Sequence, residues 1–426
     1  MIAMKRFFTL CTIVAATCLL SSCDGHSQFE KMTEKAFENA VAQYVPLADS
    51  MKANRPGRLP HSIKPDGTLA DVPPISWVSG FFPGSLWYIY EYTGDEQMMA
   101  YAKHFTHYLK KIQHVTKTHD LGFMMYCSYG NAYRLTGIEA YKNVVITSAK
   151  SLSTRYSPTV GCIKSWEPRV GCNGVDQWDF PVIIDNMMNL ELLFEASRLS
   201  GDSTFHKIAV SHANNTMKNH IRHEDYSTYH VVNYNPETGA VEHQRTQQGF
   251  ADNSTWSRGQ AWAIYGFTLC YRYTRDEAYL QTANKLANFV IDNPRLPSDG
   301  IPVWDYNVGE EGFEPVKEYT PEQIAQKPRD ASAAAVMASA MLELSTYNEG
   351  EQAERLVATA EHMLRSLSSK AYTAKVGDNK RMLLMHSVTA FPIGREIDVP
   401  LSYADYYYLE GLQRYMALEG VVYADL

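Results

Sequence analysis

Two acidic residues within apolar segments are the part of this sequence best suited to chemistry. Asp185 lies inside PVIIDNMMNLELLF (181–194), and Asp120 lies in HDLGF (119–123), ahead of another apolar run. A carboxylate is costly to remove from water without a partner, so burial favours its neutral form. Two acids that face each other in a dry cavity cannot both ionise cheaply, which leaves one protonated carboxyl beside one carboxylate. Such a pair can carry out acid–base chemistry at a sugar.

Helix capping is the structural alternative for each of these acids, because Asp is a good N-cap residue. Capping is the preferred explanation for Asp330, which precedes ASAAAV, and it stays open for Asp120. It fits Asp185 poorly, because the apolar run begins before this residue. Asp185 is therefore the strongest candidate for a chemical role.

Five similar segments predict the elements that position these residues. Each has a turn signal followed by an amphipathic helical pattern, and each comes after a helical run that is apolar on nearly every side. The five segments are YTGDEQMMAYAKHF (92–105), LTGIEAYKNVVITSA (135–149), LSGDSTFHKIAVSHA (199–213), YTRDEAYLQTANKLA (273–287) and YNEGEQAERLVATAE (347–361). An all-round apolar helix is buried and an amphipathic one faces water, so the chain repeats a hairpin of one inner and one outer helix.

Repeated hairpins of this kind predict an all-α fold, an (α/α)6 barrel of inner and outer helices. Further helices near 30–45 and 402–418 bring their number close to twelve. An open solenoid is the alternative, but its helices would not separate so sharply into two classes. Two insertions interrupt the repeat, 157–182 and 223–256, and we expect a small β-hairpin in the second, at YHVVNYNPETGAVEHQ.

In such a barrel every inner helix starts at the same end, so residues far apart in sequence meet at one mouth. The residues at these starts are Trp77, Asp120, Asp185, Arg258 and Asp330. The 28 Tyr and 7 Trp residues of the chain suit a groove for sugar rings, although each of them can equally pack a helical core.

Charge and cysteine usage exclude several classes of partner. The net charge of −8 has no strongly basic block behind it, which makes nucleic acid and anionic membrane surfaces poor candidates. The chain has no CxxC, and its His residues are scattered, so a zinc site is not expected. Proton transfer and water addition need only side chains, and we expect no metal or organic cofactor.

The N-terminus, MIAMKRFFTLCTIVAATCLLSSCDG, has the layout of an export signal, with two basic residues ahead of an apolar run too short to span a membrane comfortably. LSSC (20–23) resembles the lipoprotein cleavage box, which predicts a signal peptide over 1–22 and a lipid on Cys23; an ordinary cleaved signal is the alternative. The mature chain, 23–426, would then be a single catalytic domain in the periplasm or on the outer membrane. There Cys162 and Cys172 could form a disulfide.

Several segments together carry a family resemblance. They are THDLGF (118–123), CIKSW (162–166), VIIDNMMNLELL (182–193), DNSTWSRGQAWAIYGF (252–267) and EIDVPLSYADYYYLEGL (396–412). In this order they resemble glycoside hydrolase family 88, the unsaturated glucuronyl hydrolases. The combination of WSRGQAWAIYG with IIDNMMNLELL is the most specific part, and the resemblance extends over nearly all of the mature chain.

The resemblance implies an (α/α)6 barrel and a substrate with a Δ4,5-unsaturated uronic acid at its non-reducing end. Lyases create such ends when they cut acidic polysaccharides, including glycosaminoglycans. Members of the family protonate C4 of the enol ether and add water at C5. The resulting hemiketal collapses, the ring opens and the glycosidic bond is lost. This chemistry needs an acid that is still protonated near neutral pH.

The resemblance also assigns roles to single residues. Asp185 would be the general acid, and in the same cycle the base for water, with Asp120 as the second essential carboxylate. The substrate would be bound by His119, Trp166, His230, Gln248, Arg258 and Trp262, with Arg258 binding the uronate carboxylate through its two-pronged guanidinium. Gln247 stands where the family often has His, which puts its role in doubt. Trp77, Ser387 and Tyr403 are weaker candidates for the lining of the mouth.

Two other functions remain open. The unsaturated rhamnogalacturonyl hydrolases use the same barrel and chemistry on pectin fragments, and their substrate choice depends on loops. A non-catalytic glycan-binding lipoprotein would also need stacking aromatic residues, but it would have no use for a buried, protonated Asp185. We expect a monomer whose partner is a small acidic oligosaccharide and whose membrane attachment is the lipid on Cys23 alone.

Overall fold

The repeated hairpins supply twelve helical segments, which form two concentric rings within the described part of the chain. The computed structural model describes the backbone of residues 3–171 and 173–420, and the side chains from residue 28 onward within these ranges. The inner ring consists of α2 (Phe81–Thr93), the π-helix η2 (Gly122–Gly130) with α4 (Asn131–Thr136), the 3-10 helix η3 (Ile184–Asn189) with α6 (Leu190–Ser200), α8 (Ser257–Thr274), α11 (Ala331–Ser345) and α13 (Ser402–Leu418). Each packs on the next, and α13 packs back on α2, so the ring is closed.

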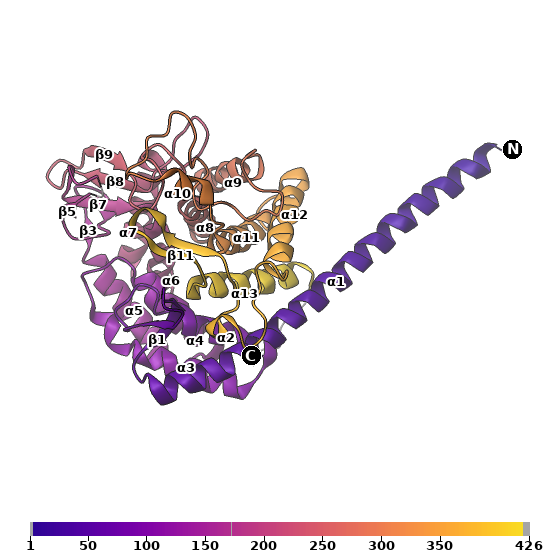
Figure 1. The fold of residues 1–426 in the computed structure, drawn as a ribbon, viewed down its shortest axis with the longest axis horizontal. Coiled ribbons are helices and arrows are strands. Elements are labelled where there is room, and N and C mark those ends of the chain that lie inside the picture. The colour runs from indigo at the N-terminus through magenta and orange to yellow at the C-terminus, as the bar shows by residue number, and fades with distance from the viewer. Residues whose placement is uncertain (1–2, 172, 421–426) are drawn as a thin grey trace.

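The outer ring alternates with the inner one along the chain (Figure 1). It consists of α1 (Ala3–Asn54), α3 (Glu96–Tyr108), α5 (Glu139–Ser153), α7 (Ser203–Asn219), α9 (Glu277–Ile291) and α12 (Gly350–Leu367). This arrangement confirms the predicted (α/α)6 barrel. The short helices η1 (Lys110–His114), α10 (Pro321–Gln326), η4 (Asn379–Arg381) and η5 (Phe391–Ile393) lie in connections.

A shared turn explains why the hairpins repeat. α2, α6 and α8 each end at a residue with positive φ, respectively Gly94, Gly201 and Arg275. An Asp follows at once, and in α3, α7 and α9 its side chain accepts a hydrogen bond from a backbone N–H of the first turn. A left-handed residue stops one helix and a capping Asp starts the next, so each of these three reversals needs only two residues.

Side-chain size sets how closely the inner helices pack. α11 is rich in Ala and is buried along nearly its whole length. A Cβ on Gly266 of α8 would lie 2.4 Å from the Cβ of Met187, so the approach of α8 to η3 requires glycine there. The outer helices bury one face only, as their amphipathic patterns predict.

The second inner helix differs from the regular α-helix that the pattern predicts. Its first turns, Gly122–Gly130, are wound as a π-helix. Gly122 is pressed against Asn189, because a Cβ there would lie 2.5 Å from the Asn189 Cα, and Asn189 Oδ1 accepts the backbone N–H of Phe123. This contact between two inner helices shifts the hydrogen-bonding register at the start of η2, and π-helices are frequent beside functional sites.

Short antiparallel strands lie at one end of the barrel. The sheets are β1 (Leu59–Ile63) with β2 (Leu69–Val72), β3 (Tyr156–Ser157) with β4 (Cys162–Ile163), β5 (Arg169–Val170) with β6 (Gln177–Trp178), β7 (Phe180–Ile183) with β8 (Val231–Tyr234) and β9 (Val241–Arg245), and β10 (Ser387–Ala390) with β11 (Arg395–Val399). The pair β8–β9 is the hairpin predicted in the second insertion.

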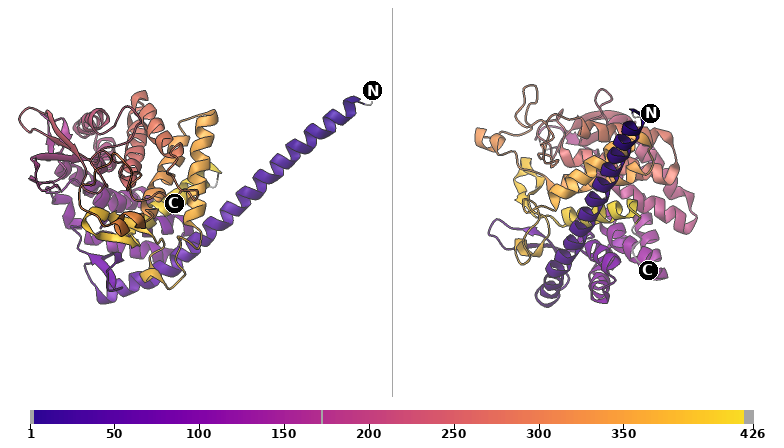
Figure 2. Two further views of the ribbon diagram at one scale, coloured as in Figure 1. Left: turned by 45° about the horizontal axis from the view of Figure 1, so that its top comes forward. Right: turned by 90° about the vertical axis from the view of Figure 1, so that its right-hand side faces the viewer.

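The N-terminal part of α1 projects away from the barrel (Figure 1 and the left view of Figure 2). Its later part packs on the body through Phe29, Phe37, Tyr44 and Met51, all of them buried. No helix among the described residues is long and apolar enough to cross a membrane. The predicted signal peptide and the lipid on Cys23 fall on residues whose side chains lie outside the described part, as does Cys172 of the predicted disulfide, while Cys162 is buried.

Candidate active site

The first turns of the inner helices and the β7–β8 pair bring the predicted site residues together. Ile183 pairs with Val231 across the two strands, and the backbone N–H of Ile184 donates to the His230 carbonyl at 3.0 Å. Asp185 and His230 therefore lie side by side although 45 positions separate them in the sequence. The Nε2 atom of His230 is 3.7 Å from Asp185 Oδ2.

Asp185 is held in surroundings that favour its neutral form. The residue is 7% exposed, and its Oδ2 has no hydrogen-bond partner among the described residues. Burial raises the pKa of Asp185 to about 7; the charge of Arg258 lowers it and that of Asp120 raises it. At neutral pH a large share of this carboxyl therefore carries a proton, as the apolar context in the sequence leads us to expect.

Asp120 is more exposed and well supplied with donors. Thr118 donates to Asp120 Oδ2 at 2.7 Å, and the His119 Nε2 atom lies 3.2 Å from Asp120 Oδ1. Its side chain makes no capping bond to η2, which answers the question left open for this residue. His119 itself is fully buried, and burial lowers the pKa of its imidazole. Asp120 is thus the second carboxyl of the site, and its charge raises the pKa of the more deeply buried Asp185.

His230 is fixed as one tautomer by the backbone. Its Nδ1 accepts the N–H groups of Gln247 at 3.1 Å and Gln248 at 3.2 Å. Burial, followed by the charge of Arg258, lowers the pKa of His230 well below its ordinary value. The neutral ring has one proton, which must then sit on Nε2 and face Asp185. Although His230 directly precedes the β8–β9 hairpin, its side chain is only 3% exposed.

Arg258 is locked into the wall of the site. Its Nη1 donates to Asp330 Oδ2 at 2.9 Å and to the Val388 carbonyl, and its Nη2 donates to the Thr389 carbonyl at 2.6 Å. The guanidinium lies 4.5 Å from the ring centroid of Trp256. Asp330 also caps α11, as predicted. Binding of a uronate by Arg258 stays a prediction, and the structure adds a second role for it as the cation whose charge lowers the pKa of Asp185.

Aromatic side chains surround these polar groups. The partly buried Trp166 is stacked near Trp178, with centroids 6.2 Å apart, and Arg169 lies 5.2 Å over the Trp166 ring. Trp262 is fully buried, and its indole N–H helps to lower the pKa of Asp185. Trp77 packs beside Tyr403, with centroids 5.1 Å apart. The predicted aromatic residues therefore lie in the walls of the same region.

The β10–β11 hairpin completes the wall. Gln248 Nε2 donates to the Thr389 carbonyl at 2.9 Å, and Thr389 Oγ1 lies 2.9 Å from the Tyr403 hydroxyl. Gln247 Oε1 and Ser387 Oγ are buried without partners among the described residues. Buried polar atoms normally find a partner, so these groups together with Asp185 Oδ2 mark a place built for a polar ligand.

Sequence reasoning missed some residues of the site. Trp256 lies between His230, with centroids 4.7 Å apart, and Arg258. Asn186 and Asn189 are buried on the same short helix as Asp185. The Asn186 side chain donates to the Ile163 carbonyl of β4, and the Asn189 side chain accepts from the Phe123 N–H of η2. Trp256 directly precedes the first helical turn of WSRGQAW, and that position could have pointed to it. The amides carry no comparable signal.

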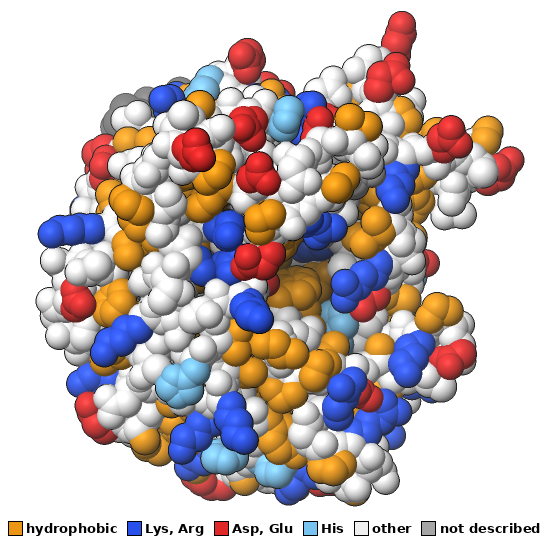
Figure 3. Space-filling model, turned by 90° about the vertical axis from the view of Figure 1, so that its left-hand side faces the viewer, with side chains coloured by type: hydrophobic (Ala, Val, Ile, Leu, Met, Phe, Trp, Pro, Cys, Tyr) orange, Lys and Arg blue, Asp and Glu red, His pale blue; other side chains and the backbone are white. Residues whose placement is uncertain are grey.

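The face of the molecule that carries β7 and β9 is hollowed. Viewed from the side of β7 and β9, it shows a hollow with hydrophobic side chains on its floor and Lys and Arg side chains around its rim (Figure 3). Among the described residues, no group of three or more His, Cys, Asp or Glu side chains is arranged to hold a metal ion. The arrangement offers a protonated carboxyl, a carboxylate partner and a neutral imidazole N–H beside aromatic walls.

Comparisons with known proteins confirm the family resemblance seen in the sequence. The model of Glycosyl Hydrolase Family 88 matches residues 48–415. The chain is 42% identical over 419 residues to an unsaturated glucuronyl hydrolase of Formosa agariphila, covering 96% of this chain and 98% of the relative. It is 32% identical over 357 residues to an unsaturated chondroitin disaccharide hydrolase of Streptococcus pyogenes, covering 82% and 84%. The crystal structure of an unsaturated glucuronyl hydrolase specific for heparin superposes with a TM-score of 0.84 at 44% identity, covering 92% and 99%.

Proposed function

The chain belongs to glycosyl hydrolase family 88, and from this membership we propose that it removes a Δ4,5-unsaturated uronic acid from the non-reducing end of acidic oligosaccharides. The substrates would be the products of lyases that cut glycosaminoglycans. The observation that carries the proposal is Asp185, a buried carboxyl whose pKa is raised to about 7 beside a second carboxylate and a neutral imidazole.

The proposed reaction hydrates the enol ether. The Asp185 carboxyl gives its proton to C4, and the C4=C5 π electrons form the new C–H bond, leaving positive charge shared by C5 and the ring oxygen. Water then adds its oxygen to C5 and returns a proton to the Asp185 carboxylate. The hemiketal opens to a ketone at C5, and the hemiacetal left at C1 releases the neighbouring sugar. One water is consumed, and Asp185 ends as it began.

His230 positions the water in this scheme. Its proton sits on Nε2, so it donates a hydrogen bond to a water oxygen and leaves proton removal to Asp185. Its distance of 3.7 Å from Asp185 Oδ2 is too long for a direct hydrogen bond. A water or a reacting carbon can therefore approach both groups together.

The other residues bind and orient the sugar. Asp120 and His119, with Asp120 Oδ1 3.2 Å from His119 Nε2, lie at the start of η2 and suit the sugar hydroxyls. The partly buried Trp166 provides an apolar face for the C–H side of the ring, while the fully buried Trp262 supports the wall behind Asp185. Gln248 and Arg258 lie at the Thr389 carbonyl, where the uronate carboxylate would find their remaining N–H groups.

Heparin-derived disaccharides are the proposed first choice among these substrates. The relative named as specific for heparin shares 44% of its residues with this chain, whereas the chondroitin disaccharide hydrolase of Streptococcus pyogenes shares 32%. A mutant of the Streptococcus agalactiae enzyme was solved with dGlcA-GalNAc6S, at 28% identity and a TM-score of 0.69. None of these relatives is named for a pectin fragment, which makes the rhamnogalacturonyl function the second candidate.

The conjugated alkene and carboxylate absorb in the near ultraviolet, and this absorbance gives the test. Purified protein is incubated with lyase-generated disaccharides from heparin, chondroitin and hyaluronan and with lyase-treated pectin. We expect the absorbance to fall on glycosaminoglycan disaccharides, fastest on those from heparin. Loss on pectin fragments alone would support the rhamnogalacturonyl function. No loss on any of them, with saturable binding of a disaccharide, would leave the glycan-binding protein.

We also propose that the mature chain, 23–426, is one exported catalytic domain anchored by a lipid on Cys23. The support is the basic and apolar N-terminal segment followed by LSSC. Labelling expressing cells with a radioactive fatty acid should mark the native chain and fail to mark the Cys23→Ser variant. An unlabelled native chain would overturn the anchor and leave the hydrolase function untouched.

A further inference from the structure

One cation at the candidate active site has no anionic partner. Arg169 lies on β5, within the first insertion, and its guanidinium is 5.2 Å from the centroid of the Trp166 ring. The residue is exposed and has no ion pair among the described residues. The proposed reaction makes no use of it so far.

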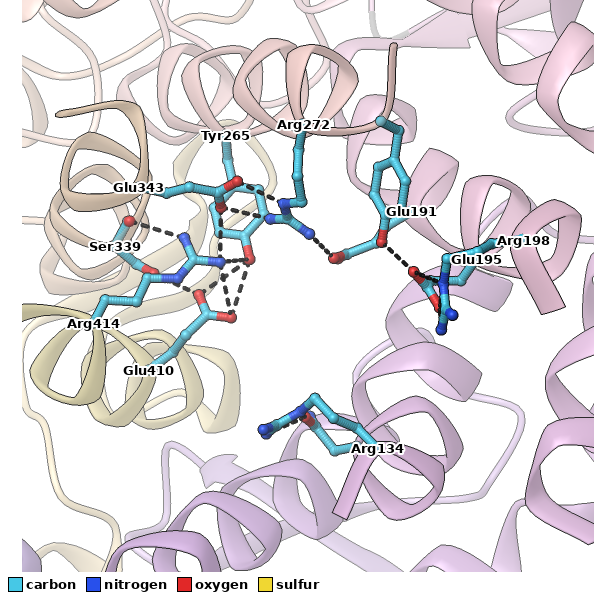
Figure 4. Close-up of polar contacts among 12 residues, drawn as sticks. Arg134, Glu191, Glu195, Arg198, Tyr265, Arg272, Ser339, Glu343, Glu410 and Arg414 are labelled. Carbon is cyan, nitrogen blue, oxygen red and sulfur yellow. Dashed lines mark hydrogen bonds and ion pairs between the residues drawn. The ribbon is translucent and has the colours of Figure 1, made fainter. Parts of the chain in front are cut away.

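Most other arginines of the described chain have a carboxylate partner. Figure 4 shows the far ends of the inner helices, where Arg272 pairs with Glu191 and Glu343, and Arg414 pairs with Glu343. We call this region the paired end. Its guanidinium groups would have to give up these contacts before they could bind an anion from solution. Arg169 has no such contacts to give up.

The acid nearest to Arg169 in the sequence is held by other cations. Glu167 Oε1 accepts a hydrogen bond from Arg155 Nη1 at 2.8 Å, and Glu167 Oε2 lies 3.5 Å from Lys164 Nζ. The chain as a whole carries a net charge of −8, which repels an anionic substrate weakly. An unpaired guanidinium beside the site supplies the local positive charge that such a substrate needs.

The β5–β6 hairpin fixes the backbone that carries Arg169. Arg169 pairs with Trp178 across the two strands, and Trp178 is fully buried. A Cβ on Gly171 would lie 2.6 Å from the Trp178 ring, so glycine is needed where the hairpin crosses this ring. Arg245 Nε donates to Asp176 at 2.6 Å, which ties the other strand of the hairpin to β9. A backbone that is already in place lowers the cost of binding a ligand.

A row of contacts connects Arg169 to the other cation of the site. In order, the row consists of Arg258, Trp256, His230, Trp166 and Arg169. Neighbouring members are 4.5–6.1 Å apart, measured between ring centroids or from a guanidinium carbon to a centroid. Asp185 lies beside His230, in the middle of the row. The row thus offers one cation to the uronate and a second cation beyond the aromatic ring that suits the next sugar.

The anionic group that suits Arg169 is a sulfate. A guanidinium presents two parallel N–H donors, which match the oxygens of a tetrahedral oxyanion. The uronate carboxylate is provided for by Arg258 at the other end of the row. In lyase-generated disaccharides of glycosaminoglycans, the anionic groups beyond the scissile bond are sulfates on the amino sugar.

We propose that Arg169 is a specificity-determining residue, which binds a sulfate group on the amino sugar next to the unsaturated uronate. This inference rests on the proposed function, because it concerns the same substrates at the same site. The sulfate takes no part in bond making, so its contact with Arg169 is the same before and during the reaction. Loss of the contact should therefore raise KM and leave kcat in place.

The test compares the native protein with Arg169→Gln on three unsaturated heparan disaccharides: one without sulfate, one N-sulfated and one sulfated at O6 of the amino sugar. We expect the ratio of kcat/KM for a sulfated form to that for the unsulfated form to fall about fivefold, through KM, for at least one sulfated form. Arg169→Lys keeps the charge and loses the two-pronged guanidinium, so its ratio should lie between the two. Added salt should lower the ratio in the native protein and leave it unchanged in Arg169→Gln.

Lys207→Gln is the matched control. Lys207 is exposed in the first turns of the outer helix α7, which begins beside the end of α6, and its replacement changes the net charge by the same amount. The ratio for this variant should equal that of the native protein. A fall in Lys207→Gln as large as that in Arg169→Gln would show an effect of net charge alone and would overturn the proposal.

Titration calorimetry in the Asp185→Asn background separates this proposal from the proposed function, because it measures binding without turnover. There Arg169→Gln should lower the ratio of sulfated to unsulfated affinity by about fivefold. If the native protein turned over none of the disaccharides, the hydrolase function would fail, while the calorimetric ratio would still decide the role of Arg169.

Equal ratios in the native protein and Arg169→Gln, for both sulfated forms, would overturn the proposal and leave the hydrolase function intact. An unsulfated, unsaturated tetrasaccharide gives a further arm, since its third sugar carries a carboxylate. If Arg169→Gln raised KM for this tetrasaccharide and not for the sulfated disaccharides, the ligand of Arg169 would be that carboxylate, and the assignment to sulfate would be wrong.

Discussion

The two ends of the inner helices treat their charges in opposite ways. At the starts of these helices, Asp185 is buried without a full partner and its pKa is raised to about 7. At their ends, Glu343 is buried too, but Arg272 and Arg414 overcome the effect of burial and hold its pKa at about 2. The inner helices thus carry one carboxyl, Asp185, that keeps its proton because it has no full partner, and another, Glu343, that stays ionised because it pairs with two arginines. The difference shows that burial alone does not set the state of an acid, since the number of nearby guanidinium groups decides it.

The largest effect should come from replacing the isolated acid. We expect Asp185→Asn to lower kcat by about a thousandfold, because no other group can protonate C4, while disaccharide binding persists. The same variant should be more stable than the native protein at pH 8. A carboxyl with a folded pKa of about 7 keeps its proton as pH rises from about 4, so the native protein loses stability through that window, by up to about 4 kcal/mol. Urea unfolding of both proteins at pH 4.5 and pH 8 measures this.

An amide at position 185 that changed stability equally at the two pH values would contradict the raised pKa. The control is Asp120→Asn, which we expect to lower turnover without the stabilisation at pH 8, because Asp120 already has the donors Thr118 and His119.

Removing the cation beside the isolated acid should come next. Arg258→Gln leaves Asp330 buried without its ion pair, and we expect a loss of about 3–5 kcal/mol in unfolding free energy. Because the charge of Arg258 lowers the pKa of Asp185, the alkaline limb of kcat/KM should move to higher pH in this variant. Arg258→Lys keeps the positive charge and loses the two-pronged guanidinium, so the alkaline limb of kcat/KM should stay at the native pH. If the alkaline limb of kcat/KM lay at the same pH in Arg258→Gln and Arg258→Lys, the effect of the Arg258 charge on the pKa of Asp185 would be contradicted.

A substitution at the ends of the inner helices, where Glu343 is paired, should change the stability of the protein and leave its activity unchanged. Arg272→Met removes the partner of Glu191 and Glu343, and we expect a loss of about 3 kcal/mol at pH 7 with kcat within about twofold of the native value. The pKa of Glu343 is depressed, so its contribution is complete above pH 4.5 and is lost as pH falls towards 2. Thermal unfolding across this range should therefore show the two proteins converging at low pH. A large fall in kcat would contradict the separation of the two ends.

The smallest effect is expected at the rim of the paired end. Arg134 contacts Glu91, but nearly half of its side chain is exposed. Exposed pairs contribute little, so Arg134→Gln should cost less than about 1 kcal/mol by urea unfolding. A loss as large as that of Arg272→Met would show that the network acts as one unit.

The fold could be predicted because its cause is local. Turn signals such as TGDE place a left-handed residue and a capping Asp at three of the reversals, and helical periodicity separates inner from outer helices without any long-range information. The candidate acid could be predicted for the same reason, since the apolar neighbours of Asp185 are adjacent in sequence.

The rest depends on contacts between distant segments. The tautomer of His230 is set by the backbone of Gln247 and Gln248, and Arg258 is held by carbonyls 130 positions away. The π-helix at Gly122 follows from the approach of Asn189. Arg272, Glu343 and Arg414 resemble ordinary surface charges in the sequence, because only the closed ring brings them together.

The packing of the first helix of the barrel, α1, on the last, α13, also has a consequence for how the chain is made. The first helix packs against the last: Phe29 stacks on Tyr415 at 3.7 Å between centroids, and Tyr44 donates to Asp405 at 2.9 Å. During synthesis the surface of the first hairpins that α13 covers in the folded protein therefore stays exposed until α13 leaves the ribosome. A ribosome-stalled chain that stops before Ser402 should be a target for chaperones and proteases, and release of the full chain should end that exposure.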